Sequence, residues 1–168
     1  MKKIVPVTLL VFAVMLNLAA GDTQWFTKKL PVQLTNAESK MIPADTLKGK
    51  ITAVYFSASW CPPCRAFTPK LVEFYNQVKD KGNFELIFVS CDRDKNAMMD
   101  YMKKYNMPFL AAPHRDPVAQ ALMRDLGVRG IPTLAVFSPD GKLITKNGRS
   151  DVMKNGAKAL ENWEAQCK

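Results

Sequence analysis

Histidine is nearly absent from this chain, and cysteine is scarce. The 168 residues include one histidine, His114, and four cysteines, of which only Cys61 and Cys64 stand close together. A structural zinc site takes four ligands, and no second CxxC pair is present to complete one. A c-type haem site needs CxxCH, and Arg65 occupies the place of that histidine. Both kinds of metal site are therefore weak alternatives.

A membrane span and a nucleic-acid-binding patch are also poorly supported. The apolar run from Ile4 to Leu18 is shorter than the roughly 20 residues that a transmembrane helix needs. The formal net charge is +9, but the lysines are spread along the chain without a basic block. We therefore expect no nucleic-acid partner. We also expect no stable membrane insertion once the N-terminal segment is removed.

The N-terminal segment instead has the pattern of a secretory signal peptide. Met1 to Lys3 is a basic beginning, the apolar run follows, and Ala19 to Gly21 offers small residues for cleavage. We predict a signal peptide over residues 1–21 and a single domain over residues 22–168. The protein is then exported, to the periplasm or out of the cell. An uncleaved anchor is the alternative.

Strand and helix patterns alternate through the predicted domain. Residues 51–57 (ITAVYFS) and 84–89 (FELIFV) are apolar and rich in β-branched or aromatic side chains, which predicts two buried strands. The other expected elements follow in chain order: helices that begin near Pro63, after Asp94 and after Asp116, a hairpin of residues 133–137 and 143–145, and a final helix over residues 152–163. This order predicts an α/β fold with a central mixed sheet flanked by helices on both faces.

The segment Cys61-Pro62-Pro63-Cys64 follows the first buried strand and opens a helix. A helix N-terminus stabilises a thiolate and lowers its pKa through the macrodipole and the free N–H groups. Because the prolines have no N–H, we expect Cys64 and Arg65 to donate to Cys61, which should be partly exposed. The pattern predicts a redox pair in which Cys61 attacks a substrate disulfide and the less accessible Cys64 resolves it. A structural disulfide is a weaker interpretation, because it would close a very small loop.

Four segments carry a family pattern in the same chain order. They are YFSASWCPPCRAFTPKLVEFY (55–75), FVSCDRD (88–94), MPFLAAP (107–113) and GVRGIPTLAVFSPDGK (127–142). Over about residues 30–163 the chain resembles the thioredoxin superfamily, and its tryparedoxin and nucleoredoxin-like branch in particular. The resemblance implies a thioredoxin fold and thiol–disulfide oxidoreductase activity. No organic cofactor or metal is expected, because the dithiol itself holds the electrons.

The resemblance also implies roles for the residues around the cysteine pair. It implies a cis peptide bond between Ile131 and Pro132, in a loop against the cysteines, with the Ile131 backbone pairing with an extended substrate. Trp60 is expected on the surface around Cys61, with a core aromatic as the alternative. The expected substrate-binding residues are Trp60, Pro62, Pro63, Gly130, Ile131 and Pro132.

One position near the cysteine pair departs from the ordinary thioredoxin pattern, and the other two cysteines need a separate interpretation. Ordinary thioredoxins carry a buried aspartate where this chain has Tyr55, so proton transfer from Cys64 needs another group or water, as in tryparedoxins. Glu73 and Asp92 are conceivable groups for this transfer. We expect Cys91 to be a half-buried residue beside the active-site strand, with a third redox thiol as the alternative. A Cys91–Cys167 disulfide is not expected, because the fold separates these positions by more than about 7 Å.

The predicted partners follow from this chemistry. We expect protein or small-molecule disulfides and dithiols as substrates, an unidentified redox partner that recycles the CPPC pair, and a monomer. Two other functions stay open: a thioredoxin-fold module that binds peptides without turnover, and a metal chaperone.

Overall fold

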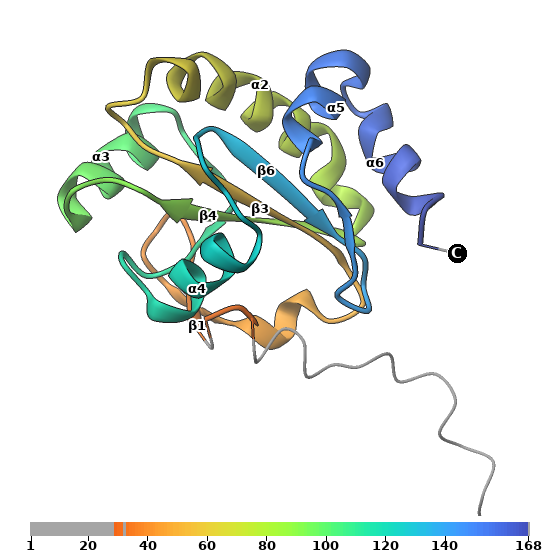
Figure 1. Cartoon of the computed structure of the whole chain (residues 1–168), viewed down its shortest axis with the longest axis horizontal. Helices are drawn as coiled ribbons and strands as arrows, with labels where there is room; N and C mark the ends of the chain where they lie inside the picture. The colour runs from red at the N-terminus through yellow and green to blue at the C-terminus, as the bar shows by residue number, and fades with distance from the viewer. Residues whose placement is uncertain (1–28, 32, 168) are drawn as a thin grey trace, which may run out of the picture.

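The computed structural model describes residues 29–31 and 33–167, so the predicted signal peptide lies outside the described residues. Its strands are β1 (Gln33–Thr35), β2 (Met41–Pro43), β3 (Ile51–Ser57), β4 (Phe84–Ser90), β5 (Leu110–Ala111), β6 (Thr133–Phe137) and β7 (Leu143–Thr145). They form one mixed sheet in the order β2-β1-β5-β4-β3-β6-β7 (Figure 1). The predicted mixed sheet is confirmed.

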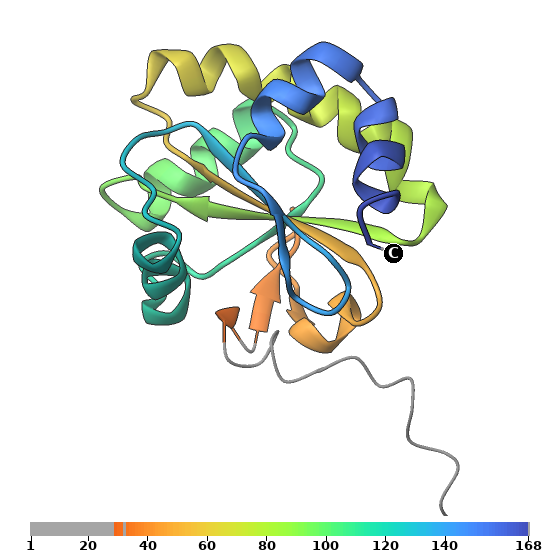
Figure 2. The ribbon, with the colours of Figure 1, turned by 45° about the vertical axis from the view of Figure 1, so that its right-hand side comes forward.

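Helices cover both faces of the sheet, as the sequence predicted (Figures 1 and 2). The helical elements are α2 (Pro62–Val78), α3 (Lys95–Lys104), α4 (Pro117–Asp125), α5 (Gly148–Asn155), α6 (Lys158–Glu164) and two 3-10 turns, η1 (Ala44–Leu47) and η2 (Lys79–Lys81). Apolar residues of α2, α3, α5 and α6 form one core cluster, and those of α4 and η1 form another across the sheet. Within the residues described, no helix has the length and apolar character needed to cross a bilayer.

Strand β3 lies at the centre of the fold and is buried along its whole length. Its side chains alternate between the two cores, with Ala53 and Tyr55 on one face and Val54 and Phe56 on the other. Burial on both faces explains the continuous apolar sequence of this strand. β3 runs parallel to β4 and antiparallel to β6, so its end lies beside the end of β4 and the start of β6.

The C-terminal region differs from the sequence prediction. One helix was expected over residues 152–163, and this is wrong, because α5 ends at Asn155 and α6 begins at Lys158. Gly156 between them has φ 53° and ψ −135°, and glycine reaches positive φ without a Cβ clash. After this turn, Trp163 of α6 packs against Phe74 and Phe84 with ring centroids 5.7 and 6.1 Å apart.

The start of α5 packs closely on β6. Gly148 is buried, and a Cβ at this position would lie 2.8 Å from the carbonyl oxygen of Leu134 and 2.9 Å from Cγ2 of Val136. Atoms this close must move apart, and one of them belongs to the backbone of a central strand. Only glycine lets α5 approach the sheet to this distance.

Replacing Gly148 by alanine is therefore expected to destabilise the fold. We expect Gly148→Ala to lower the free energy of unfolding by about 1–3 kcal/mol, since overpacking shifts the β6 backbone. Denaturation in guanidinium chloride measures the change. Gly130→Ala is the matched control, because a Cβ there meets nothing within 4 Å. An equal loss in both variants would contradict the close-packing explanation.

Candidate functional site

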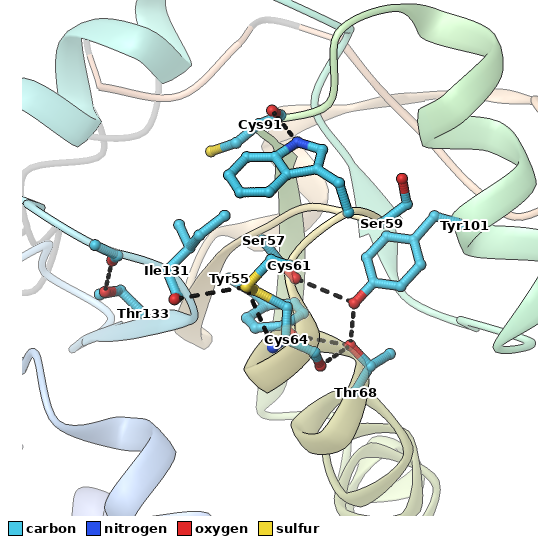
Figure 3. The surroundings of a disulfide bond; sticks show 12 residues. Tyr55, Ser57, Ser59, Cys61, Cys64, Thr68, Cys91, Tyr101, Ile131 and Thr133 are labelled. Atoms are coloured by element: carbon cyan, nitrogen blue, oxygen red, sulfur yellow. Dashed lines mark hydrogen bonds between the residues drawn. A yellow bond between two sulfur atoms is a disulfide. The ribbon is translucent and has the colours of Figure 1, made fainter.

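Cys61 and Cys64 are joined by a disulfide at the start of α2 (Figure 3). Their Cα atoms are 5.2 Å apart. Cys61 is the N-cap of the helix, while Pro62 and Pro63 form its first turn and are exposed. The prediction that the cysteine pair opens a helix directly after a buried strand is confirmed.

The N–H groups near Cys61 are used in two different ways. The Cys64 N–H donates to Sγ of Cys61 at 3.3 Å, as the sequence predicted. The Arg65 N–H donates instead to the carbonyl oxygen of Cys61 at 3.1 Å, so the expectation that it reaches the sulfur is wrong. The reason is the helix itself, whose first i to i−4 hydrogen bond takes this donor.

Both cysteines are enclosed, and Cys61 is more enclosed than the sequence suggested. Cys61 is 3% exposed and Cys64 is fully buried, so the expected order of accessibility is confirmed. The expectation that Cys61 is partly exposed is wrong for this disulfide form. Ala58 forms a small buried cluster with the two cysteines, and Cys91 and Ile131 pack against it.

Trp60 lies on the surface next to the disulfide. Its side chain is 57% exposed, which excludes the alternative of a core aromatic. The indole Nε1 donates to the carbonyl oxygen of Cys91 at 3.3 Å (Figure 3). This bond joins the segment before the cysteine pair to the residue that follows β4.

The loop before β6 reaches the cysteine pair from the other side. The peptide bond between Ile131 and Pro132 is cis, as the resemblance implied. The carbonyl oxygen of Ile131 lies 3.6 Å from Sγ of Cys61 (Figure 3). Gly130 is exposed, and its carbonyl oxygen accepts from the Thr133 hydroxyl at 2.8 Å. The structure therefore brings the GIPT loop and the CPPC segment together.

A buried carboxylate holds the segment that precedes the cysteines. Asp92 is 4% exposed, and its Oδ1 accepts from the N–H and the hydroxyl of Ser59 at 2.8 and 2.7 Å. Its Oδ2 accepts from the Ser90 hydroxyl at 2.8 Å, and its carbonyl oxygen lies 2.9 Å from Nε2 of His114. The sequence analysis named Asp92 only as a conceivable group for proton transfer and did not predict these hydrogen bonds. The available signal was a set of polar residues at the carboxyl ends of two adjacent parallel strands.

A cluster of buried hydroxyl groups lies next to Cys64 and includes Tyr55, which stands where ordinary thioredoxins carry an aspartate (Figure 3). The Thr68 hydroxyl donates to the carbonyl oxygen of Cys64 at 2.9 Å, which leaves its oxygen to accept from Tyr55 at 2.9 Å and Tyr101 at 2.6 Å. Ser57 completes the cluster, 3.2 Å from the Tyr101 hydroxyl. Burial raises the pKa of Tyr55, so this hydroxyl is neutral at physiological pH. An uncharged network therefore replaces a carboxylate.

The other two cysteines are free thiols. Cys91 is half-buried, as expected, and this burial raises the pKa of its thiol, with a further rise from neighbouring Asp92. A raised pKa keeps Cys91 protonated, unlike an activated thiol. Cys167 is exposed and also free. Among the residues that the structure describes, no three His, Cys, Asp or Glu side chains gather as a metal site.

Comparisons with known proteins agree with this geometry. Residues 49–143 match the family model described as thioredoxin-like. Probable nucleoredoxin 1 of Arabidopsis thaliana is 47% identical over 131 residues, which is 77% of this chain. The chain spans only 22% of the length of that relative.

Solved structures of similar proteins match over nearly their whole length. Tryparedoxin from Trypanosoma brucei is 36% identical with a TM-score of 0.74, over 83% of this chain and 97% of that one. A tryparedoxin II in complex with glutathionylspermidine is 34% identical with a TM-score of 0.72, over 83% and 95% of the two chains. The chain therefore belongs to the thioredoxin-like family, with nucleoredoxins and tryparedoxins among its relatives.

Proposed function

We propose that this chain is a thiol–disulfide oxidoreductase that reduces or exchanges disulfides through Cys61 and Cys64. The observation that carries the proposal is the Cys61–Cys64 disulfide at the N-terminus of α2, with the Ile131 carbonyl oxygen 3.6 Å from Sγ of Cys61. Nucleoredoxins and tryparedoxins among its relatives support it. The tryparedoxin II complex with glutathionylspermidine supports small-molecule thiols as substrates beside protein disulfides.

The proposed reaction starts from the reduced pair. The Cys61 thiolate, favoured by the helix N-terminus, attacks one sulfur of a substrate disulfide and forms a mixed disulfide. The first substrate thiolate leaves and takes up a proton. Cys64 then attacks the Cys61 sulfur, releases the second substrate thiol and closes the Cys61–Cys64 disulfide. Two electrons pass to the substrate, and an external dithiol must return them.

The substrate is proposed to lie across the surface between the CPPC segment and the GIPT loop. Its extended backbone pairs with Ile131 in the manner of an added strand. The six proposed contact residues border the disulfide from two sides: Trp60, Pro62, Pro63, Gly130, Ile131 and Pro132. Enclosure of Cys61 in the disulfide form restricts attack to a thiol that enters along this surface.

Asp92 is proposed as a positioning residue for this surface. Its three hydrogen bonds join Ser59, two residues before Cys61, to Ser90 at the end of β4. The Trp60 indole bonds to Cys91 next to the same carboxylate. The segment that carries Trp60 and Cys61 is thereby held in one arrangement against the sheet.

We also propose that the protein acts as an exported monomer, in the periplasm or outside the cell. The support is the basic, apolar and small-residue pattern of residues 1–21. An exported enzyme of this kind needs a recycling partner in the same compartment, since disulfide exchange there is set by the local redox poise.

Replacing each of the two cysteines by serine is expected to have a different effect on the reaction. Cys61→Ser should reduce turnover of a peptide disulfide to the background rate, because the attacking sulfur is gone. Cys64→Ser should accumulate a mixed disulfide at Cys61, seen by mass spectrometry without reductant. If the protein is instead a binding module, the unaltered chain will show no turnover, and Cys61→Ser will keep its affinity for the peptide.

Removal of the Asp92 carboxylate should disturb both stability and catalysis. Asp92→Ala leaves the donors of Ser59 and Ser90 without their acceptor, so we expect a loss of about 1–3 kcal/mol in the free energy of unfolding. We also expect a lower kcat/KM. Asp92→Asn keeps one acceptor oxygen and should lose less of both quantities. Equal effects of the two variants on kcat/KM would speak against positioning by these hydrogen bonds.

Export has a direct test in the mature N-terminus. The full chain, expressed in a secreting host, should appear outside the cytosol with Asp22 as its first residue by N-terminal sequencing. Leu10→Arg places a charge in the apolar run and should keep the protein inside at full length. Recovery of the unaltered chain in the cytosol, beginning at Met1, would show that the export proposal is wrong.

A further inference from the structure

Lysine and arginine have different environments on this surface. Every ion pair found among the described residues uses a lysine; the pairs are Lys29–Asp125, Lys48–Asp45, Lys50–Glu85, Lys70–Glu73, Lys81–Glu161 and Lys142–Asp140. No arginine takes part in an ion pair within that part of the chain. The guanidinium group is the side chain best suited to bind a carboxylate through two parallel hydrogen bonds.

Two arginines have surroundings in the fold that explain their positive charge. The Arg149 guanidinium lies over the Phe67 ring, 5.9 Å from its centroid. Arg124 lies in the last turn of α4, where a positive charge is favourable. Four exposed arginines remain, and we call them the arginine rim: Arg65, Arg93, Arg115 and Arg129.

The residues of the arginine rim lie in the segments next to the proposed substrate surface. Arg65 directly follows Cys64 in α2, and Arg129 lies two residues before Ile131, whose carbonyl oxygen is 3.6 Å from Sγ of Cys61. Arg93 directly follows Asp92, whose carboxylate binds Ser59. Arg65 lies at the start of α2, and Arg93 and Arg129 lie in two loops at the same edge of the sheet.

Arg115 is bonded to the loop that carries Arg93. Its Nη2 donates to the carbonyl oxygen of Arg93 at 3.1 Å, so two rim residues are in contact. Its backbone has φ 58°, a left-handed conformation that residues with a Cβ adopt uncommonly. A guanidinium has five N–H donors on three nitrogens, and the hydrogen bond to Arg93 uses only the Nη2 nitrogen.

The carboxylates in the same loops serve the fold. Asp94 accepts from the Ala97 N–H at 2.9 Å and caps α3. Asp116 accepts from the N–H groups of Val118 and Ala119 at 2.9 and 3.0 Å and caps α4. Asp92 is buried and is bound by its serines. None of these groups forms an ion pair with the arginine rim in the described residues.

We propose that the arginine rim selects acidic polypeptide segments as disulfide substrates. Asp or Glu side chains flanking the substrate cysteine pair with the rim guanidinium groups while the substrate backbone lies along Ile131. The inference deepens the proposed function and depends on it, since it names the substrate class of the same site. Complementary charge at a site entrance raises the association rate and penalises substrates of like charge.

Matched peptides test the proposal. Three peptides share one disulfide and differ only in their flanking residues, which are glutamate, glutamine or lysine. At low ionic strength we expect kcat/KM for the glutamate peptide to exceed that for the lysine peptide by about tenfold, the scale of a few exposed ion pairs. The ratio should fall toward one as salt is raised to about 0.5 M. A ratio of one at low salt would overturn the proposal.

Two triple variants locate the effect. Arg93→Gln, Arg115→Gln and Arg129→Gln together should reduce the ratio of glutamate to lysine peptide to less than about twofold. The control combines Lys79→Gln, Lys154→Gln and Lys158→Gln, exposed lysines of η2, α5 and α6. The control has the same change in net charge and should keep the ratio. An equal drop in both variants would show that only net charge acts, and the rim would lose its role.

A binding measurement separates the rim from the chemistry. If no peptide of any charge is reduced, the proposed function fails. Fluorescence anisotropy of the reduced, labelled peptides on the same chain then still tests the rim. Tighter binding of the glutamate peptide, lost only in the arginine variant, supports the proposal. A single-stranded oligonucleotide that binds more tightly than this peptide would overturn it in favour of a general polyanion surface.

Discussion

The pairing of β3 with β4 on one side and β6 on the other is the constraint on which the site depends. The parallel register with β4 sets the ends of the two strands side by side, so that Ser57 lies opposite Ser90. The antiparallel register with β6 places Thr133 beside Phe56, directly after the cis peptide bond. A slip of one residue in either ladder would move each side chain of the slipped strand from one core to the other and separate the loops.

Hydrogen bonds then hold the loops that strand pairing brings together. The Asp92 carboxylate and the Trp60 indole each join the segment before the cysteines to the loop after β4. Below them, the hydroxyl cluster satisfies the carbonyl oxygen of Cys64 without placing a charge in the core. Buried polar groups in this region are therefore bonded, which gives the disulfide a rigid setting.

The sequence predicted the parts of the fold that local pattern determines. The continuous apolar strand at residues 51–57, the proline-led helix after Cys61 and the Asp94 and Asp116 caps are all found in the structure. The enclosure of Cys61 was missed, because it arises from Ala58 and Ile131, which only the folded chain brings together.

The break at Gly156 and the role of Asp92 were missed for related reasons. A glycine within an amphipathic pattern is compatible with a helix, and the turn accompanies the packing of Trp163 on Phe74 and Phe84, which the sequence does not reveal. Asp92 follows a strand as many loop aspartates do. Its partners come from β4 and from a serine far earlier in the chain, so no local pattern reveals them.

The uncharged cluster around Tyr55 has a consequence for how the redox poise responds to acidity. A buried carboxylate beside a dithiol would take up or release a proton when the thiols are oxidised or reduced. The equilibrium between dithiol and disulfide would then involve one more proton. Tyr55, held neutral by burial, adds no such proton across the physiological range. The cluster beside Cys64 therefore leaves the pH dependence of the exchange between dithiol and disulfide unchanged.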